Sequence, residues 1–145
     1  SGSYRELQSN RGDDKDVAAS YAHGHFALIS GKLTLNYLKL TWGETNGDGG
    51  FIFMASGILA INWVHFDGSK TTGRANTGGC IRIEDGTVTI KQSTFEGCRA
   101  STGGAMYVQK TSTPMTIEST TFRNNDATVR FIFVGIVKIQ EINLY

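Results

Sequence analysis

Apolar and polar residues alternate in short stretches along this chain, with the period of β-strands that bury one face. The clearest stretch is 103–125, where Met106 and Val108 alternate with smaller or polar residues. A turn containing Pro114 follows, and then a second strand with a two-residue corner before Thr120. A single pair of such strands cannot bury its apolar face, so the rest of the chain must supply further copies.

The same two-strand pattern recurs along the chain. The expected buried positions of the second strand are Leu33, Leu35, Leu38 and Leu40; Leu59, Ile61, Val64 and Phe66; Val88, Ile90, Ser93 and Phe95; Met115, Ile117, Thr120 and Phe122; and Val137, Ile139, Ile142 and Leu144. The fourth position falls at 40, 66, 95, 122 and 144, after 26, 29, 27 and 22 residues. This repeat predicts an all-β, right-handed parallel β-helix of about five coils over 23–145, preceded by a polar lead-in at 1–22.

Glycine and phenylalanine mark the same places in successive units. We interpret seven residues as structural repeat positions: Gly50, Gly79 and Gly104 before the first strand, Phe66, Phe95 and Phe122 at the end of the second, and Asn125, which closes a coil. The chain has 18 glycines and 1 proline. That composition suits many tight turns joined to a continuous parallel sheet.

Two cysteines, Cys80 and Cys98, both lie in the third unit. One pair cannot close a zinc site. Cys98 stands where Asn125 stands in the next unit, a position that suits a small buried side chain. The places of the two cysteines in the coil do not obviously meet, so we expect free buried thiols, with a disulfide as the alternative.

Candidates for chemistry are sparse. Paired histidines flank Gly24, and Asp13-Asp14, Gly24-His25 and Arg82-Ile83 loosely resemble, in the same order, motifs of solenoid polygalacturonases. Such hydrolases need carboxylates that converge across coils, whereas the acidic residues of the repeated strands are scattered, at Glu84, Glu118 and Glu141. We therefore predict no catalytic residues and no cofactor.

The glycine-rich stretch 46–50 is a turn by composition. Its alternative is a calcium loop, because Asp48 lies among small residues with oxygen ligands nearby. Calcium-binding solenoids repeat such loops many times, and this chain has one. We therefore predict a coil-to-coil turn and no metal.

Charge and hydropathy argue against nucleic-acid binding and against a membrane-spanning segment. The formal net charge is +1, without the basic stripe of a nucleic-acid binder. The uncharged stretch 51–64 is too short to cross a membrane, and the repeat accounts for its apolar positions. We predict neither a nucleic-acid partner nor a transmembrane span.

Alternation places a set of mostly aromatic residues outward on the first strand of each unit. These predicted partner-contact residues are Phe51, Phe53, Arg82, Tyr107, Phe131 and Phe133, with Ala27, Cys80 and Ala105 among them. A contiguous exposed aromatic strip typically marks a surface for a partner, protein or glycan. The alternative is that the N-terminal segment or the long turn 67–77 covers the strip.

The motif Gly103-Gly104-Ala105-Met106, followed by Phe122-Arg123-Asn124-Asn125, resembles the repeat of the bacterial polymorphic outer membrane proteins. The preceding unit is a weaker copy, with Cys80 for Ala and Cys98 for Asn. The resemblance implies a surface-displayed β-helical passenger, in several members an adhesin, and an extracellular or cell-surface location.

These observations predict a non-catalytic structural or adhesive solenoid that acts through surface contacts. The alternatives are an accessory structural subunit of a larger complex, membrane-bound or organellar, and thirdly a polysaccharide-active enzyme of the pectin-lyase-like type. The stretch 131–137 is strongly apolar, and nothing polar follows Leu144 except the carboxyl terminus of Tyr145. We therefore expect further coils or a protein partner to cover the C-terminal edge, within a larger protein or assembly.

Overall fold

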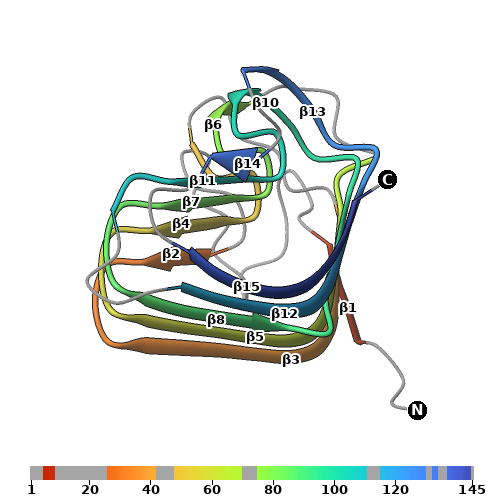
Figure 1. Ribbon diagram of the computed structural model, residues 1–145. Helices are drawn as coiled ribbons and strands as arrows, with labels where there is room; N and C mark the ends of the chain where they lie inside the picture. The colour runs from red at the N-terminus through yellow and green to blue at the C-terminus, as the bar shows by residue number, and fades with distance from the viewer. Residues whose placement is uncertain are drawn as a thin grey trace.

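The structure, a computed structural model, describes residues 5–8, 26–41, 48–69, 75–110, 115–129, 132–133 and 137–144. The strands in these ranges stack into a β-solenoid, and no helix occurs among them (Figure 1). All pairings between the strands are parallel. The predicted all-β parallel solenoid is confirmed, while its right hand and its five coils stay predictions.

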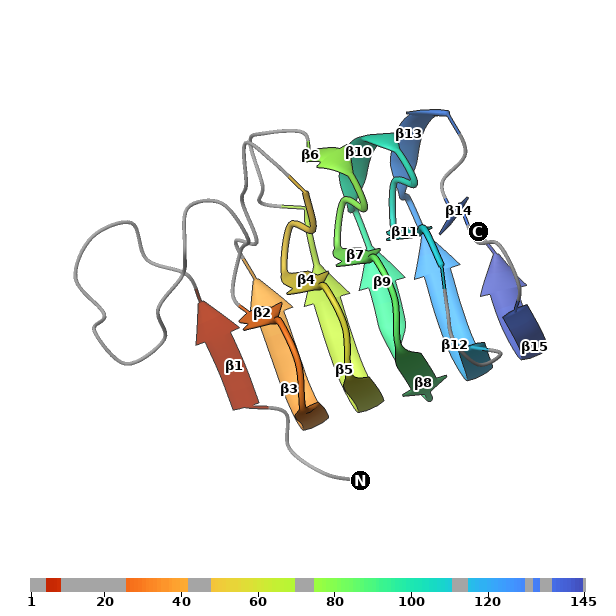
Figure 2. The same ribbon diagram turned by 90° about the vertical axis from the view of Figure 1, so that its left-hand side faces the viewer.

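Three sheets form the walls of the solenoid. The seven-stranded sheet contains β1 (Arg5–Gln8), β3 (Lys32–Thr41), β5 (Ile58–Asp67), β8 (Thr87–Lys91), β9 (Thr94–Glu96), β12 (Met115–Arg123) and β15 (Val137–Leu144). The five-stranded sheet contains β2 (Phe26–Leu28), β4 (Ile52–Met54), β7 (Ile81–Ile83), β11 (Met106–Val108) and β14 (Ile132–Phe133). The three-stranded sheet contains β6 (Ala75–Thr77), β10 (Arg99–Thr102) and β13 (Asp126–Val129). Figure 2 shows the strands of successive coils side by side.

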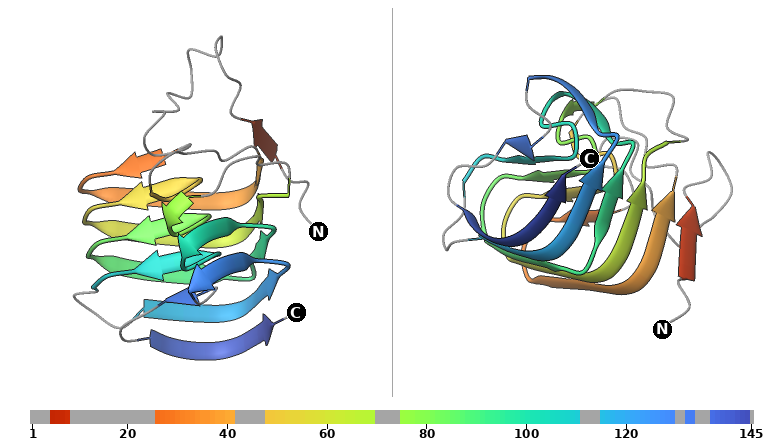
Figure 3. Two further views of the ribbon diagram at one scale, coloured as in Figure 1. Left: turned by 90° about the horizontal axis from the view of Figure 1, so that it is seen from above. Right: turned by 45° about the vertical axis from the view of Figure 1, so that its right-hand side comes forward.

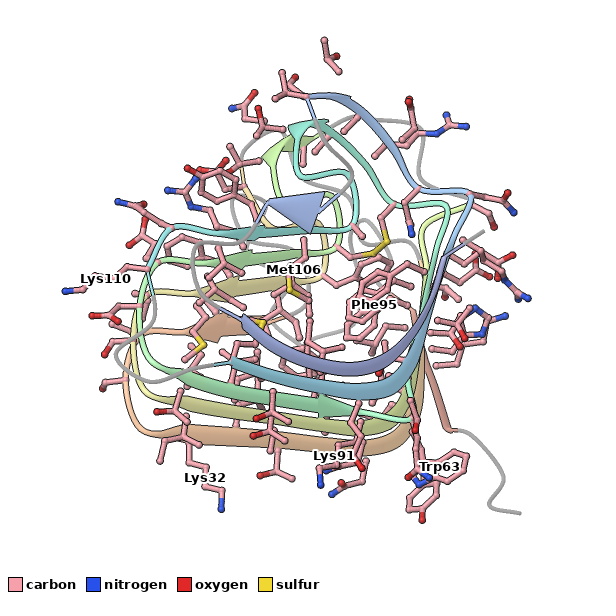
Figure 4. The ribbon with its side chains drawn as sticks, in the orientation of Figure 1. Lys32, Trp63, Lys91, Phe95, Met106 and Lys110 are labelled. Atoms are coloured by element: carbon pink, nitrogen blue, oxygen red, sulfur yellow. A yellow bond between two sulfur atoms is a disulfide. The ribbon has the colours of Figure 1, made fainter. Side chains whose placement is uncertain are left out.

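Equivalent residues of successive coils meet in register inside the solenoid. Ile61, Ile90 and Ile117 are paired neighbours and are fully buried, which confirms the predicted register. The rings of Phe66 and Phe95 stack with centroids 4.5 Å apart, and those of Phe95 and Phe122 with centroids 4.8 Å apart. We call these three phenylalanines the inner stack. Figure 4 shows Phe95 and Met106 directed into the interior.

The seven-stranded sheet turns a corner, so that it forms two walls of each coil (Figure 3). Four residues at this corner have a left-handed backbone, and we call them the bend column: Tyr37 (φ 53°), Trp63 (φ 54°), Gln92 (φ 47°) and Ser119 (φ 47°). The left-handed residue redirects the strand so that the next residue points inward again. Buried hydroxyl groups form hydrogen bonds with the backbone at this corner. Ser93 Oγ accepts one from Val64 N–H (3.1 Å), and Thr120 Oγ1 donates one to Glu118 O (2.9 Å).

A second corner precedes the five-stranded sheet, where the glycine pairs lie. Gly78 and Gly103 have φ of 62° and 65°, which favours glycine. A Cβ on Gly79 would collide with the carbonyl oxygen of Gly104, and a Cβ on Gly104 would lie 2.5 Å from the carbonyl oxygen of Asp126. The neighbouring coils therefore approach too closely here for any side chain.

This corner overturns part of the predicted alternation. The Cys80 carbonyl oxygen accepts hydrogen bonds from both Phe51 N–H (2.8 Å) and Ile52 N–H (3.1 Å), which is the hydrogen-bond pattern of a β-bulge. One coil further on, the Ala105 carbonyl oxygen likewise accepts hydrogen bonds from both Cys80 N–H (2.9 Å) and Ile81 N–H (3.1 Å). A bulge puts two successive side chains on one side, so Phe51, Cys80 and Ala105 are fully buried and their predicted outward placement is wrong.

The same corner joins the two cysteines. Cys80 and Cys98 form a disulfide, with Cα atoms 5.4 Å apart and a sequence separation of 18. Free thiols were therefore the wrong prediction, because the bulge turns Cys80 inward toward Cys98. In the next coil Asn125 takes part in closure by hydrogen bonds: its Oδ1 accepts from Cys98 N–H (3.0 Å) and its Nδ2 donates to Phe95 O (3.0 Å).

The two ends of the seven-stranded sheet are β1 and β15. Arg5–Gln8, within the polar N-terminal stretch, pairs with β3 at Leu38 to Thr41. At the other end β15 pairs with β12 and places Ile139 opposite Ile117. The side chains of β14 and β15 lie outside the described residues, so the covered C-terminal edge stays a prediction.

Candidate contact surface

The outer face of the five-stranded sheet brings three of the predicted contact residues together. Phe53, Arg82 and Tyr107 are paired neighbours on β4, β7 and β11. We call these three residues the contact ladder. Phe133 follows Tyr107 in register, but its side chain and the whole of Phe131 lie outside the described residues. Of the six predicted residues, Phe51 belongs instead to the core.

Arg82 is the centre of the contact ladder. Its Nη1 lies 3.3 Å from Asp48 Oδ2, and its Nη2 lies 3.2 Å from Glu84 Oε1. Nη2 also donates to Gln109 Oε1 (3.3 Å), and Nη1 donates to the Thr77 hydroxyl. The guanidinium carbon lies 5.2 Å from the centroid of the Tyr107 ring, within cation–π range.

These contacts fix the guanidinium. The Arg82 side chain is only 15% exposed, and its Nε is buried without a hydrogen-bond partner among the described residues. Asp48 is itself held, because its Oδ1 accepts from Thr77 N–H (3.0 Å) and from the Thr77 hydroxyl. Two carboxylates drawn from different coils therefore hold one arginine against one aromatic ring. The result is a preformed surface with little rotamer freedom.

The predicted alternative was that the long turn 67–77 covers the strip. Thr77, at the end of that turn, lies against Arg82, and residues 70–74 are outside the described residues. Phe53 and Tyr107 are half-buried. The turn thus covers part of Arg82, and Phe53 and Tyr107 each keep part of their surface in solvent.

Of the three scattered acidic residues on the repeated strands, Glu84 and Glu118 are paired with cations, and the side chain of Glu141 lies outside the described residues. Glu84 pairs with Arg82, and Glu118 Oε2 lies 3.1 Å from Lys91 Nζ. His23, His25, Asp13 and Asp14 lie outside the described residues. Over the described ranges, histidine, cysteine and acidic residues do not gather in a group of three that could hold a metal ion. At the glycine-rich turn, where a calcium loop was the alternative, the Asp48 carboxylate accepts a hydrogen bond from Thr77 N–H and pairs with Arg82.

A second charged cluster follows the bend on the seven-stranded sheet. His65 Nε2 lies 3.0 Å and Arg123 Nη2 2.8 Å from Glu96 Oε2, and Lys39 Nζ lies 3.3 Å from Asp67 Oδ2. The hydrogen bond from Arg123 lowers the pKa of Glu96 against the opposing effect of burial, and His65 lowers it further.

The pKa of Asp67 is also lowered. Burial alone raises the pKa of its carboxyl, but hydrogen bonds from Ser69 and Lys39 outweigh burial and leave the pKa lowered. Both carboxyls are therefore ionised at neutral pH. They stabilise neighbouring cations and do not carry a proton for acid catalysis.

Sequence reasoning missed one feature of the bend column. Tyr37 and Trp63 are 46% and 40% exposed, and their rings are parallel within 8° with centroids 6.3 Å apart. Figure 4 shows Trp63 projecting outward from the corner. The available signal was an aromatic residue at the corner position of two consecutive units, where a small polar residue would suffice for the turn.

Comparison with protein-family models, with curated proteins and with solved structures found no match to this chain. The resemblance to the polymorphic outer membrane protein repeat therefore stays a prediction. Within the described ranges there is no helix of the length and apolarity that a membrane-spanning helix requires.

Proposed function

We propose that this chain is a non-catalytic structural or adhesive β-solenoid that binds a protein partner through the contact ladder. The observation that carries the proposal is the fixed position of Arg82, between Asp48 and Glu84 and over Tyr107. Tyrosine and arginine are enriched among the residues that dominate protein–protein binding. A side chain that is already ordered loses less entropy when a partner docks, so this surface is suited to binding.

The disulfide supports a location outside the reducing cytosol. Disulfides persist in oxidising compartments, and Cys80 and Cys98 are joined and almost fully buried. This agrees with the extracellular or cell-surface location that the family resemblance implies. An adhesive module at a cell surface requires no catalytic group.

The ion pairs support the non-catalytic part of the proposal. Glycoside hydrolysis requires two carboxyls across the scissile bond, one of them an acid with a raised pKa. Here Glu84 and Glu118 are each paired with a cation, and the pKa of Glu96 is lowered. These carboxylates are suited to holding coils together.

The test is binding of the purified, labelled chain to intact cells and to immobilised extracellular-matrix proteins. We expect Phe53→Ser and Tyr107→Ser each to weaken binding by about 30-fold, the effect of losing a residue worth about 2 kcal/mol. Val129→Ser is the matched control, because Val129 is 51% exposed on the three-stranded sheet. Unchanged binding in both contact-ladder variants would contradict the proposal.

Two further outcomes decide between the alternatives. A partner that co-purifies in fixed stoichiometry and masks Tyr107 would identify an accessory subunit of a complex. Turnover of pectic or other acidic polysaccharides, tested with and without calcium and lost in His25→Ala, would identify an enzyme and overturn the non-catalytic assignment.

A further inference from the structure

The exposed aromatic pair of the bend column lies on a different face from the contact ladder and has no role in the core. The rings of Tyr37 and Trp63 are parallel, yet their centroids are 6.3 Å apart, against 4.5 Å and 4.8 Å in the inner stack. Parallel rings at the larger spacing overlap only in part. Each ring therefore leaves part of its face uncovered, in agreement with exposed fractions of 46% and 40%.

The backbone shows that the turn does not require these side chains. Both residues have a left-handed backbone, which costs a non-glycine residue about 1–2 kcal/mol. In the next two coils Gln92 and Ser119 form the same bend without a ring. The fold therefore needs a left-handed residue at the corner and does not need an aromatic one. All four residues of the bend column share this strain, so it is the aromatic side chains of Tyr37 and Trp63, and not their backbone, that point to a role outside the fold.

Hydrogen-bonding groups flank the rings on both sides. Asn36 and Asn62 each stand one residue before the bend column. Asn62 Nδ2 donates a hydrogen bond to Asn36 Oδ1 (2.9 Å), and Asn36 Nδ2 and Asn62 Oδ1 take no part in this bond. The row continues in register through Lys91 to Glu118, which are themselves paired. Two residues after the bend column are Lys39 and His65, which belong to the charged cluster with Asp67 and Glu96.

This combination fits one chemical class. The negative face of an aromatic ring attracts the polarised C–H groups on the flat side of a sugar ring. Amides and carboxylates supply the donors and acceptors that hydroxyl groups require. Cations and carboxylates are paired within the flanking rows, which favours a neutral ligand over nucleic acid or another polyanion.

We infer that the bend column is a saccharide-binding site, with Tyr37 and Trp63 as its stacking platform. A neutral oligosaccharide packs its C–H groups on the parts of the two ring faces that the pair leaves uncovered. Its hydroxyls bind to the Asn36–Asn62 row on one side and to the charged cluster on the other. This site is independent of the contact ladder.

The experiment uses the full chain with soluble gluco-, xylo-, manno- and chito-oligosaccharides. Binding is measured by calorimetry and by tryptophan fluorescence in a Trp42→Phe background, which leaves Trp63 as the single tryptophan. We expect at least one of the oligosaccharides to bind with Kd below about 1 mM and to shift the Trp63 emission. A single-stranded oligonucleotide of similar length is the probe for stacking on bases.

Trp63→Asn and Tyr37→Asn are the deciding variants, because asparagine tolerates the left-handed backbone. We expect each to weaken saccharide binding at least tenfold while Tm stays the same or rises. Calorimetry reports the binding of Trp63→Asn, which lacks the fluorophore. Ile58→Thr is the matched control, since Ile58 is 47% exposed at the start of β5. Phe53→Ser is expected to keep full saccharide affinity, which separates this site from the contact ladder.

Three results would overturn the inference: no oligosaccharide binds more tightly than about 1 mM, the oligonucleotide binds in preference, or the asparagine variants lose stability together with binding. The third would show that the aromatic pair is structural. None of these results affects protein binding through Phe53 and Tyr107, so the two proposals fail separately.

Discussion

The two aromatic stacks of this solenoid have the same origin and opposite consequences. Each exists because parallel register places equivalent residues of successive coils above one another. The inner stack is fully buried, with its rings 4.5 Å and 4.8 Å apart. The Tyr37–Trp63 pair is exposed, its rings lie 6.3 Å apart, and its backbone is left-handed.

Register alone therefore does not make a stack stabilising. Burial of apolar area and close packing supply most of the stabilisation inside, with a smaller contribution from ring geometry. In the outer pair, Tyr37 and Trp63 stay 46% and 40% exposed, and their left-handed backbone conformation is unfavourable. The comparison distinguishes buried residues that stabilise the fold from exposed residues that contribute little to its stability. Each prediction below tests that distinction.

The largest expected effect is on the inner stack. Phe95→Ala removes the middle ring and leaves a cavity between Phe66 and Phe122, so we expect a loss of about 3–5 kcal/mol in the free energy of unfolding. Trp63→Ala is the matched change at the outer pair and is expected to stay within about 0.5 kcal/mol. Urea unfolding of both variants measures the difference. Equal losses would show that the outer pair is part of the core.

The next effect concerns the disulfide beside the inner stack. Cys80 occupies the corner position that Phe51 holds one coil earlier, where the Phe51 ring lies edge-on to Phe66 with centroids 5.7 Å apart. The bond closes a loop with a separation of 18 residues. Replacing both cysteines with alanine should cost about 3 kcal/mol, through greater freedom of the unfolded chain. Thermal unfolding of the double variant, beside the reduced native chain, checks this.

The third effect is a change of stability with pH that comes from the charged cluster of Glu96 and Asp67. The pKa of Glu96 is below its ordinary value of 4.5 in the folded chain. Its contribution to stability is therefore present above the unfolded pKa and is lost as the pH falls through the folded pKa. Asp67 changes stability with the same sign. We expect Tm to fall on acidification below about pH 4.5.

Glu96→Gln is the variant that tests this assignment. It should lower Tm at neutral pH and make the fall in acid shallower, because one titrating carboxyl is gone. Phe95→Leu is the control, since it perturbs the inner stack without changing any titratable group. An identical acid profile for Glu96→Gln and the native chain would rule out this carboxylate as a source of the pH dependence.

The smallest effect tests the strain of the bend column. Gln92→Gly removes a left-handed non-glycine residue, and we expect a net gain of about 0.5–1 kcal/mol after the greater freedom of glycine in the unfolded chain is included. Trp63→Gly provides the comparison at the aromatic position of the same column. Urea midpoints of both glycine variants give the sign of the effect. A clear loss in Gln92→Gly would mean that its side chain stabilises the corner.

The period of the sequence determined most of the fold. Positions such as Ile61, Ile90 and Ile117 could be predicted as an inner row, because burial on one face of a strand imposes alternation on the residues themselves. The spacing of the units predicted parallel stacking for the same reason. For the contact ladder, alternation correctly predicted that Phe53, Arg82 and Tyr107 are neighbours.

Only the tertiary structure decided where alternation stops. At the glycine corner, one carbonyl of the next coil accepts two N–H groups, and this bulge turns Phe51 and Cys80 inward and brings Cys80 to Cys98. At the bend, the left-handed backbone carries Tyr37 and Trp63 out of the wall as a pair. Both features depend on contacts between successive coils, which are distant in the sequence, whereas a strand period is local. A local pattern therefore identifies the walls of this solenoid, and contacts between its coils determine its corners.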